Sequence, residues 1–186
     1  MYKKVSNILI YHLPIHIIMM VTALLPDCEP VNKLRGILLK PFFKQCGRNL
    51  QVASNVYFTH INNIDLGENV YIARNCWIGG YGGILVDDNV MIGPGVVIAS
   101  SNHSYSNGSI RYGSNEKKEI SIGKEVWVGA NSTILPGVKL NNNIIVGAGS
   151  VVCKNIDESI CLIAGSPARY IKKIENKKNI NFEISI

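Results

Sequence analysis

Aliphatic residues recur every six positions along most of this chain. Units such as "LGENVY", "VDDNVM" and "IGPGVV" open with Leu, Ile or Val, usually carry Asn or Gly at the fourth position, and place Val or a small residue at the fifth. The pattern runs from about residue 52 to residue 152. It matches neither the period of about 3.6 residues of an amphipathic helix nor the period of about two of a half-buried strand. A fixed internal repeat of this kind indicates a solenoid.

Each position of the six-residue unit has a physical role if the unit is a short strand followed by a corner. The aliphatic first residue points inward, and the small fifth residue fits the narrower space beside it. The corner requires a positive φ, which Gly adopts freely and Asn tolerates better than most residues. Three corners close a triangle, and stacked triangles form a parallel β-helix. We expect positive φ values at five asparagines, namely Asn69, Asn75, Asn89, Asn131 and Asn143.

Three segments carry two extra residues between aliphatic positions and mark the start of a new coil. They are "NIDLG", "GILVD" and "EISIG". The first two lie 20 residues apart, which gives the coil length, and the third follows 36 residues later. The surplus predicts a loop extruded over residues 100–120, which contains His103. Counted in this way, the chain predicts a β-helix of about five coils.

The N-terminal segment has a different pattern. Residues 8–25 form an apolar run of marginal membrane-spanning length, but two histidines and Pro14 disfavour a free-standing span. We expect a helix that packs on the domain or its oligomer; a helix on a membrane surface is the second interpretation, and a cleaved signal the third.

A second helix is expected in "EPVNKLRGILLK", before Pro41 ends it. Its apolar stripe consists of Val31, Leu34, Ile37 and Leu38. The whole chain is therefore expected to be an all-β solenoid with terminal extensions. Its parts are a helical segment over 1–45, the β-helix with its loop over 46–157, and a C-terminal extension over 158–186.

The composition excludes several classes of protein. The net charge of +6 comes partly from lysine-rich ends, so it indicates a solvated surface rather than a nucleic-acid partner. Five cysteines without a C-x-x-C pair fit the reducing cytoplasm, and we expect each to be a small buried thiol. The histidines show no metal-binding spacing, so no metal site is expected. The sequence contains no regular T-x-T ladder, so an ice-binding or scaffold solenoid is not expected.

Three segments resemble the hexapeptide-repeat acyltransferases, a family of left-handed parallel β-helices. They are "SNHSY", "EVWVGANSTILPGVKLNNNIIVGAGSVVCKNI" and "IAGSPARYIKKI", and the resemblance covers about residues 46–175. It implies a left-handed β-helix and a homotrimer that binds acetyl-CoA, without a metal, in the cleft between adjacent prisms. The β-helical carbonic anhydrases would instead need three histidines converging on zinc, and the loop has only one.

The resemblance also implies roles for individual residues. His103 matches the general base, which would be delivered by the loop into the neighbouring prism's cleft. The backbone N–H of Ala130 matches the donor to the oxyanion. Matched in the same way, the residues that would contact CoA are Ala130, Ala148, Cys153, Lys154, Arg169 and Lys172.

The acceptor site departs from the galactoside and maltose members, which carry an asparagine where this chain has Gly79. Candidate acceptor residues are Trp127, expected at the base of the loop, with Tyr57, His60, Trp77 and Tyr81.

The N-terminal organisation resembles the O-acetyltransferases of capsule and O-antigen assembly. The resemblance therefore implies acetyl transfer to a sugar hydroxyl of a cell-surface polysaccharide or its precursor, in the cytoplasm or at the inner face of the membrane. Acetylation of an antibiotic of the streptogramin or chloramphenicol type is the alternative.

Overall fold

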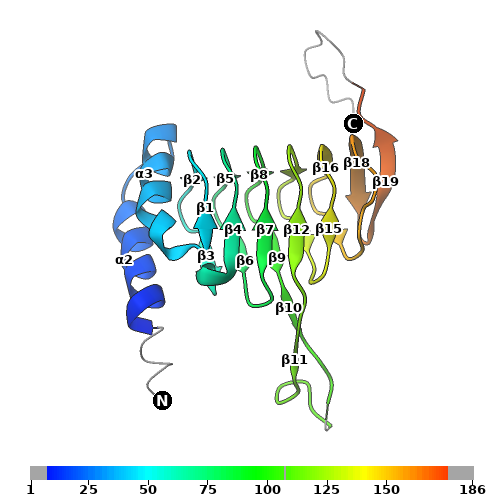
Figure 1. The fold of residues 1–186 in the computed structure, drawn as a ribbon, viewed down its shortest axis with the longest axis horizontal. Helices are drawn as coiled ribbons and strands as arrows, with labels where there is room; N and C mark the ends of the chain where they lie inside the picture. Colours follow the sequence, from blue (N-terminus) through cyan, green and yellow to red (C-terminus); the bar gives the residue numbers. More distant parts are fainter. Residues whose placement is uncertain (1–7, 107, 176–186) are drawn as a thin grey trace.

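The computed structural model describes residues 8–106 and 108–175. It is a β-solenoid of about six turns with helices across its N-terminal end (Figure 1). The first sheet consists of β1 (Gln45–Cys46), β4 (Ile64–Leu66), β7 (Ile84–Val86), β12 (Ile120–Ile122) and β15 (Lys139–Leu140). The second consists of β2 (Gln51–Val52), β5 (Tyr71–Ile72), β8 (Met91–Ile92), β13 (Trp127–Val128), β16 (Ile144–Val146), β18 (Cys161–Gly165) and β19 (Ala168–Lys173). The third consists of β3 (Tyr57–Thr59), β6 (Trp77–Gly79), β9 (Val97–Ala99), β14 (Thr133–Ile134) and β17 (Val151–Val152).

The strand register confirms the coil length expected from the sequence. Ile64 pairs with Ile84, and Ile84 pairs with Ile120, although the second step spans 36 residues. All neighbouring strands of the three sheets are parallel except β18 and β19. The turns number about six rather than five because β1 precedes the first repeat and β18 follows the last one.

The core is lined by the first and fifth positions of the repeat. Both positions are buried because they point into the prism. Buried first-position residues are Val52, Leu66, Ile72, Ile78, Val86, Ile92, Ile122, Val128, Ile134, Leu140 and Val146. Buried fifth-position residues are Val56, Val70, Cys76, Val90, Val96, Val126, Ser132, Val138, Ile144 and Ser150.

The corners adopt the predicted conformation. All five named asparagines have φ values between 56° and 61°. Their side chains also connect the coils: the Nδ2 of Asn49 donates to the Oδ1 of Asn69, and the Nδ2 of Asn69 donates to the Oδ1 of Asn89, both at 2.9 Å. The Nδ2 of Asn89 donates in turn to the Oε1 of Glu125, at 2.8 Å. This side-chain ladder runs along one corner of the solenoid.

The helical segment covers the N-terminal end of the solenoid. It contains η1 (Ile8–His12), α2 (Leu13–Thr22), α3 (Glu29–Leu39) and η2 (Lys40–Phe42), and α3 packs against β2. The apolar stripe of α3 does not form its buried face, because Asn32, Arg35, Gly36 and Leu39 face inward instead. Gly36 allows this approach, since any Cβ there would clash with the carbonyl of Leu50.

Buried Arg35 connects the helices to the first coil. Its guanidinium donates to the Thr22 carbonyl at 2.8 Å and to the Asp27 carboxylate at 2.7 Å. The same carboxylate accepts from the backbone N–H of Ser54 at 2.9 Å and from the Ser54 hydroxyl at 2.7 Å. Burial acts to raise the pKa of Asp27, but the hydrogen bonds from Ser54 and Arg35 outweigh it and lower that pKa.

The expected loop is a hairpin that projects from the side of the solenoid (Figure 1). Its strands, β10 (Ser101–His103) and β11 (Asn115–Lys117), are antiparallel. Buried Ser100 closes the base, because its hydroxyl donates to the Gly79 carbonyl at 2.7 Å and its own carbonyl accepts from the N–H of Lys118 at 3.0 Å.

Two further expectations concern the N-terminal helices and the cysteines. Within the described ranges, no helix is both long and apolar enough to cross a membrane. The expectation of five buried thiols was wrong for Cys28, which precedes α3, and for Cys153, in the turn after β17, because both are exposed; Cys46 is half-buried. Burial raises the pKa of the Cys76 and Cys161 thiols. Of the lysine-rich ends, Lys3, Lys4, Lys177 and Lys178 lie outside the described residues, whereas Lys172 and Lys173 belong to β19.

Candidate active site

His103 ends the outgoing strand of the hairpin. It pairs with Asn115 on β11, and its side chain is exposed. Among residues 8–106 and 108–175, no side chain forms a hydrogen bond with its imidazole. The ring is therefore accessible to a substrate that approaches the hairpin from outside the chain.

The backbone N–H of Ala130 lies at the corner between the second and third sheets. Its carbonyl accepts a hydrogen bond of 2.8 Å from the N–H of Gly149, one coil further along. The N–H itself donates to no acceptor in the described part of the chain. A half-buried, unengaged N–H fits the requirement for an oxyanion donor, because it is available when negative charge develops.

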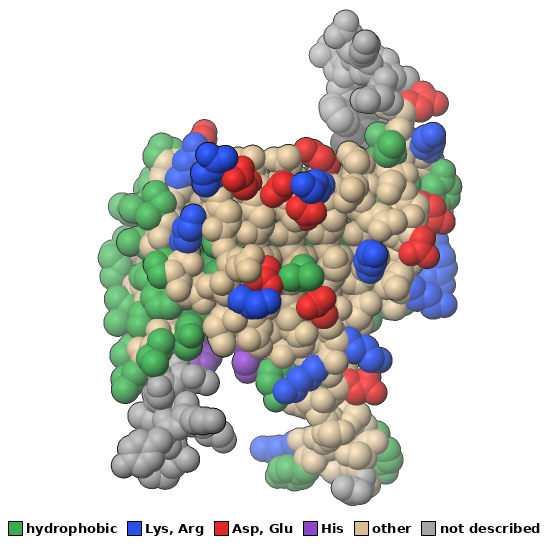
Figure 2. All heavy atoms as spheres, in the orientation of Figure 1, with side chains coloured by type: hydrophobic (Ala, Val, Ile, Leu, Met, Phe, Trp, Pro, Cys, Tyr) green, Lys and Arg blue, Asp and Glu red, His purple; other side chains and the backbone are tan. Residues whose placement is uncertain are grey.

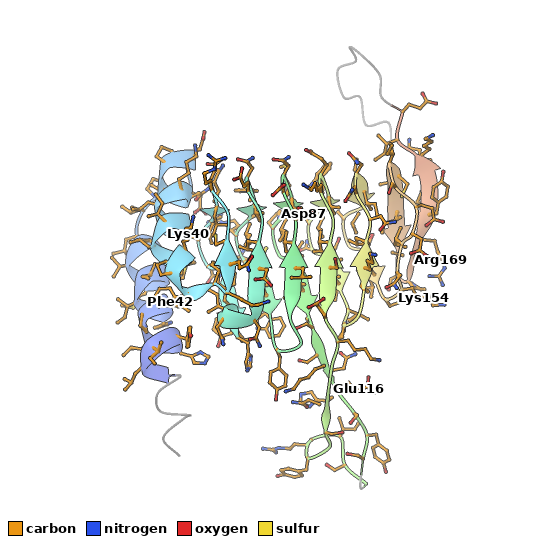
Figure 3. All side chains as sticks on the ribbon, in the orientation of Figure 1. Lys40, Phe42, Asp87, Glu116, Lys154 and Arg169 are labelled. Atoms are coloured by element: carbon orange, nitrogen blue, oxygen red, sulfur yellow. The ribbon has the colours of Figure 1, made fainter. Side chains whose placement is uncertain are left out.

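The residues expected to contact CoA follow the solenoid toward its C-terminal end. Ala148 lies at the corner one coil beyond Ala130, and Lys154 follows β17. Figure 3 shows Lys154 and Arg169 at this C-terminal end, where both side chains are exposed. Within the described ranges, neither forms an ion pair, so their charges are available to phosphates.

The remaining two CoA candidates lie in the same region. Cys153 is exposed next to Lys154, and Lys172 is exposed on β19, opposite Leu162 of β18. Together with Lys154 and Arg169, Lys172 places positive charge at the C-terminal end of the solenoid.

The third sheet carries two of the aromatic acceptor candidates. Tyr57 of β3 is 55% exposed and pairs with Trp77 of β6. The indole of Trp77 lies over Gly79, since a Cβ at that position would approach the Cζ3 of Trp77 to 2.6 Å. The space that a side chain at position 79 would take is therefore filled by the indole.

His60 and Tyr81 meet near the base of the hairpin. Their ring centroids lie 4.5 Å apart, and the Nζ of Lys117 lies 3.9 Å from the centroid of the Tyr81 ring. Burial lowers the pKa of His60, and His12 and Lys117 lower it further. Lys117 was not predicted from the sequence, because it is 36 residues from Tyr81 and belongs to no repeat unit. Histidine side chains are visible in Figure 2 on this edge, between the helices and the hairpin.

Trp127 lies elsewhere than expected. It belongs to β13 of the second sheet, whereas the hairpin connects the third sheet to the first, so it is not at the base of the loop. It lines a groove of about 310 Å³ together with Tyr71, Met91 and the charged pair of Arg74 and Asp27. Tyr71 and Met91 were not predicted, although both share the sixth position of the repeat with Trp127.

One chain does not bring all the candidates together. His60, Trp77 and Tyr81 lie on or beside the third sheet, while Trp127 lies on the second. The hairpin carries His103 beyond the solenoid (Figure 1), and its base contacts the third-sheet group through Lys117.

Similarity to known proteins identifies the family of this chain. The family described as "Bacterial transferase hexapeptide (six repeats)" matches residues 119–154. Galactoside O-acetyltransferase of Escherichia coli K12 is 34% identical over 143 residues, which cover 77% of this chain and 70% of that protein. WbbJ of the same strain, whose name assigns it to lipopolysaccharide biosynthesis as an O-acetyl transferase, is 27% identical over 82% of this chain and 92% of its own length.

A solved structure, galactoside acetyltransferase in complex with coenzyme A, superposes with a TM-score of 0.80. It is 31% identical, and the match covers 92% of this chain and 85% of that chain. Sequence and fold therefore agree: the chain belongs to the hexapeptide-repeat acetyltransferase family.

Proposed function

We propose that this protein transfers the acetyl group of acetyl-CoA to a hydroxyl of a sugar, in a cell-surface polysaccharide or its precursor. The observation that carries the proposal is the exposed imidazole of His103 on the only hairpin that the described solenoid extrudes. Two relatives support the proposed substrates. One is named a galactoside O-acetyltransferase, and one solved relative is a complex with coenzyme A.

The reaction needs one proton acceptor and one oxyanion donor. The imidazole of His103 accepts the proton of the sugar hydroxyl while that oxygen attacks the thioester carbon. The N–H of Ala130 donates a hydrogen bond to the oxygen of the tetrahedral intermediate. The C–S bond then breaks, the acetyl group stays on the sugar, and the CoA sulfur takes the proton from the imidazolium. The role requires the neutral form of the imidazole, in which one ring nitrogen carries a free lone pair.

The site is shared between subunits of a homotrimer. The second-sheet groove at Trp127 and the third-sheet group at Trp77 occupy different faces of one prism, and the hairpin carries His103 beyond the prism. In a cyclic trimer, each interface is formed by two different faces of the subunit, so the second-sheet face of one chain meets another face of its neighbour. The groove at Trp127 and the group at Trp77 then lie next to the same hairpin.

A polysaccharide acceptor is supported by two observations. The match to WbbJ extends over 92% of that protein, whose name assigns it to lipopolysaccharide biosynthesis. The acceptor side of the site has an indole over Gly79, and an aromatic ring of this kind packs against the apolar face of a sugar.

The direct test is turnover of acetyl-CoA with a panel of acceptors. The panel contains galactosides, maltose, nucleotide-activated sugars, O-antigen and capsule fragments, and chloramphenicol, and product formation is followed by thiol release and by mass spectrometry of the acceptor. We expect acetylation of a saccharide, abolished in His103→Ala. Transfer to chloramphenicol but to no saccharide would replace the proposed acceptor class, and an absence of transfer to any hydroxyl would overturn the function.

A further inference from the structure

The turn between β6 and β7 carries one side chain, that of Tyr81, because its other three residues are glycines. Two of these glycines are required by close packing on either side. A Cβ at Gly80 would approach the carbonyl oxygen of His60 to 2.7 Å. A Cβ at Gly82 would approach the backbone nitrogen of Lys118 to the same distance. The turn is therefore packed between the corner at His60 and the base of the hairpin.

Hydrogen bonds hold the turn against the hairpin base. The N–H of Gly82 donates to the hydroxyl of Ser100 at 2.8 Å, and the N–H of Gly83 donates to the carbonyl of Gly80 at 3.0 Å. Ser100 precedes the outgoing strand of the hairpin, and its carbonyl accepts from Lys118, which follows the returning strand. Both ends of the hairpin are thus attached to this turn.

Lys117 and His103 lie on the same face of the hairpin. Lys117 pairs with Ser101, and the side chains of two directly paired residues project from one face. His103 follows Ser101 by two positions, so its side chain projects from that face as well. Glu116, labelled in Figure 3, and Lys118 lie on the opposite face, where their side chains pair at 3.3 Å.

The ring of Tyr81 is in contact with two side chains of the same chain. The Nζ of Lys117 lies 3.9 Å from the ring centroid, within the range of a cation–π contact. The imidazole of His60 lies against the same ring, with its centroid at 4.5 Å. Because burial lowers the pKa of His60, its imidazole is uncharged at pH 7 and does not repel the ammonium group. In the described part of the chain, Lys117 pairs with no carboxylate.

We infer that Lys117 is a positioning residue, which holds the hairpin on Tyr81 and so sets the direction in which His103 meets the substrate. The constraint acts through the antiparallel strand pair, in which Lys117 and His103 are separated by two residues, or about 7 Å, along the strand. Tyr81 and His60 then hold the hairpin instead of the acceptor. The inference rests on the proposed role of His103 as general base.

The first test removes the charge of Lys117 and keeps its aliphatic stem. Lys117→Met should lower kcat about three- to tenfold, because the base is oriented less well, and should leave the KM for acetyl-CoA within about twofold. Lys117→Arg keeps a cation that stacks on aromatic rings and should retain kcat. The matched control is Lys118→Met, which removes the same charge on the opposite face and should retain both kcat and the thermal unfolding midpoint.

A double-mutant cycle identifies the partner of Lys117. Tyr81→Leu should lower kcat by a similar factor, and the double variant Lys117→Met/Tyr81→Leu should lose no more than the larger single loss, because both changes remove one contact. Losses that multiply would show that the two side chains act separately, and would overturn the inference. Normal kcat in Lys117→Met, or an equal loss in Lys118→Met, would overturn it as well.

Hydrogen exchange without substrate separates this inference from the proposed function. The N–H of Ser104, which donates across the hairpin to the carbonyl of Ser114 at 3.0 Å, should exchange about threefold faster or more in Lys117→Met and Tyr81→Leu. It should exchange at the wild-type rate in Lys117→Arg and Tyr81→Phe, which keep a cation and a ring. Unchanged exchange in Lys117→Met would overturn the contact whatever the protein acetylates. Faster exchange in a protein whose wild type acetylates no sugar would overturn the proposed function, and with it the role of His103, but not the contact.

Discussion

The indole of Trp77 occupies the space above Gly79. The contact atoms belong to the far end of a side chain that can rotate, so a residue larger than glycine displaces the ring rather than the strand. We predict that Gly79→Asn raises the KM for the acceptor at least several-fold, with little change in the KM for acetyl-CoA, because it moves an aromatic surface at the acceptor side. Steady-state kinetics with each substrate varied in turn check this.

A companion variant distinguishes displacement of the ring from damage to the strand. In Trp77→Ala/Gly79→Asn the space is free, so the double variant should unfold at a higher temperature than Gly79→Asn alone. Equal unfolding midpoints would contradict the contact between ring and position 79.

His103→Ala should lose turnover by roughly 10²–10⁴-fold, the usual size of a general-base contribution. The fold should not change, because the hairpin lies outside the core. Acetyl-CoA affinity, measured by calorimetry, should stay near the wild-type value. Arg111→Ala, an exposed change in the same hairpin, serves as the control and should keep its turnover. Near-normal turnover in a folded His103→Ala protein would remove His103 from the mechanism.

A site shared between subunits makes a quantitative prediction for mixed trimers. If His103 of one chain meets the CoA-binding residues of its neighbour, His103→Ala and Arg169→Glu subunits complement each other. Random assembly from equal amounts restores about one quarter of the sites of a cyclic trimer, and turnover should recover in proportion. Sedimentation of each preparation should give about three times the chain mass of 20.4 kDa. Turnover no higher than the mean of the two parents would place the whole site in one chain.

Arg169→Ala and Lys154→Ala should raise the KM for acetyl-CoA more than they lower kcat. Their expected partners are CoA phosphates far from the reacting carbon, so the lost interaction is made equally in the ground and transition states. Lys139→Ala provides a matched control, because Lys139 is exposed on the first sheet, away from the CoA candidates. A fall in kcat with unchanged CoA affinity would place these side chains nearer the chemistry.

Asp27→Asn should destabilise the protein by about 2 kcal/mol at pH 7, because buried Arg35 loses a charged partner. The pKa of Asp27 is lowered by folding, so its contribution is complete above the unfolded value of about 3.9 and disappears as the pH falls through the folded value. The gap between variant and wild type in urea unfolding should therefore be constant above about pH 5 and shrink below about pH 4. Glu29→Gln removes an exposed pair and should change stability little at either pH.

The solenoid was predictable because its repeat places one constraint on each position. The corner asparagines and the inward residues adopt the predicted roles, and the coil continues in register beyond the hairpin. The buried face of α3 was not predictable from periodicity, because Arg35 is buried by acceptors at Thr22 and Asp27 that lie before the helix. Local pattern identifies an apolar stripe, whereas tertiary hydrogen bonds decide which face turns inward.

The candidate site was only partly predictable for a similar reason. His103 was recognisable because it interrupts the repeat, and Ala130 because its neighbours match a motif. The groove at Trp127 was missed, since it arises from strand register: Tyr71, Met91 and Trp127 align across coils 20 and 36 residues apart. The pairing of Lys117 with Tyr81 depends on how the hairpin bends back, which no sequence period encodes.

The ladder from Asn49 through Asn69 and Asn89 to Glu125 crosses the hairpin without interruption. The last step spans 16 residues more than the earlier ones, yet the amide still finds an oxygen at the same corner. A segment inserted at the Ser100 closure therefore leaves the hydrogen-bond ladder along this corner of the prism unbroken. Hairpins of other lengths and compositions can be exchanged at this point, so substrate choice can evolve separately from the scaffold that supports it.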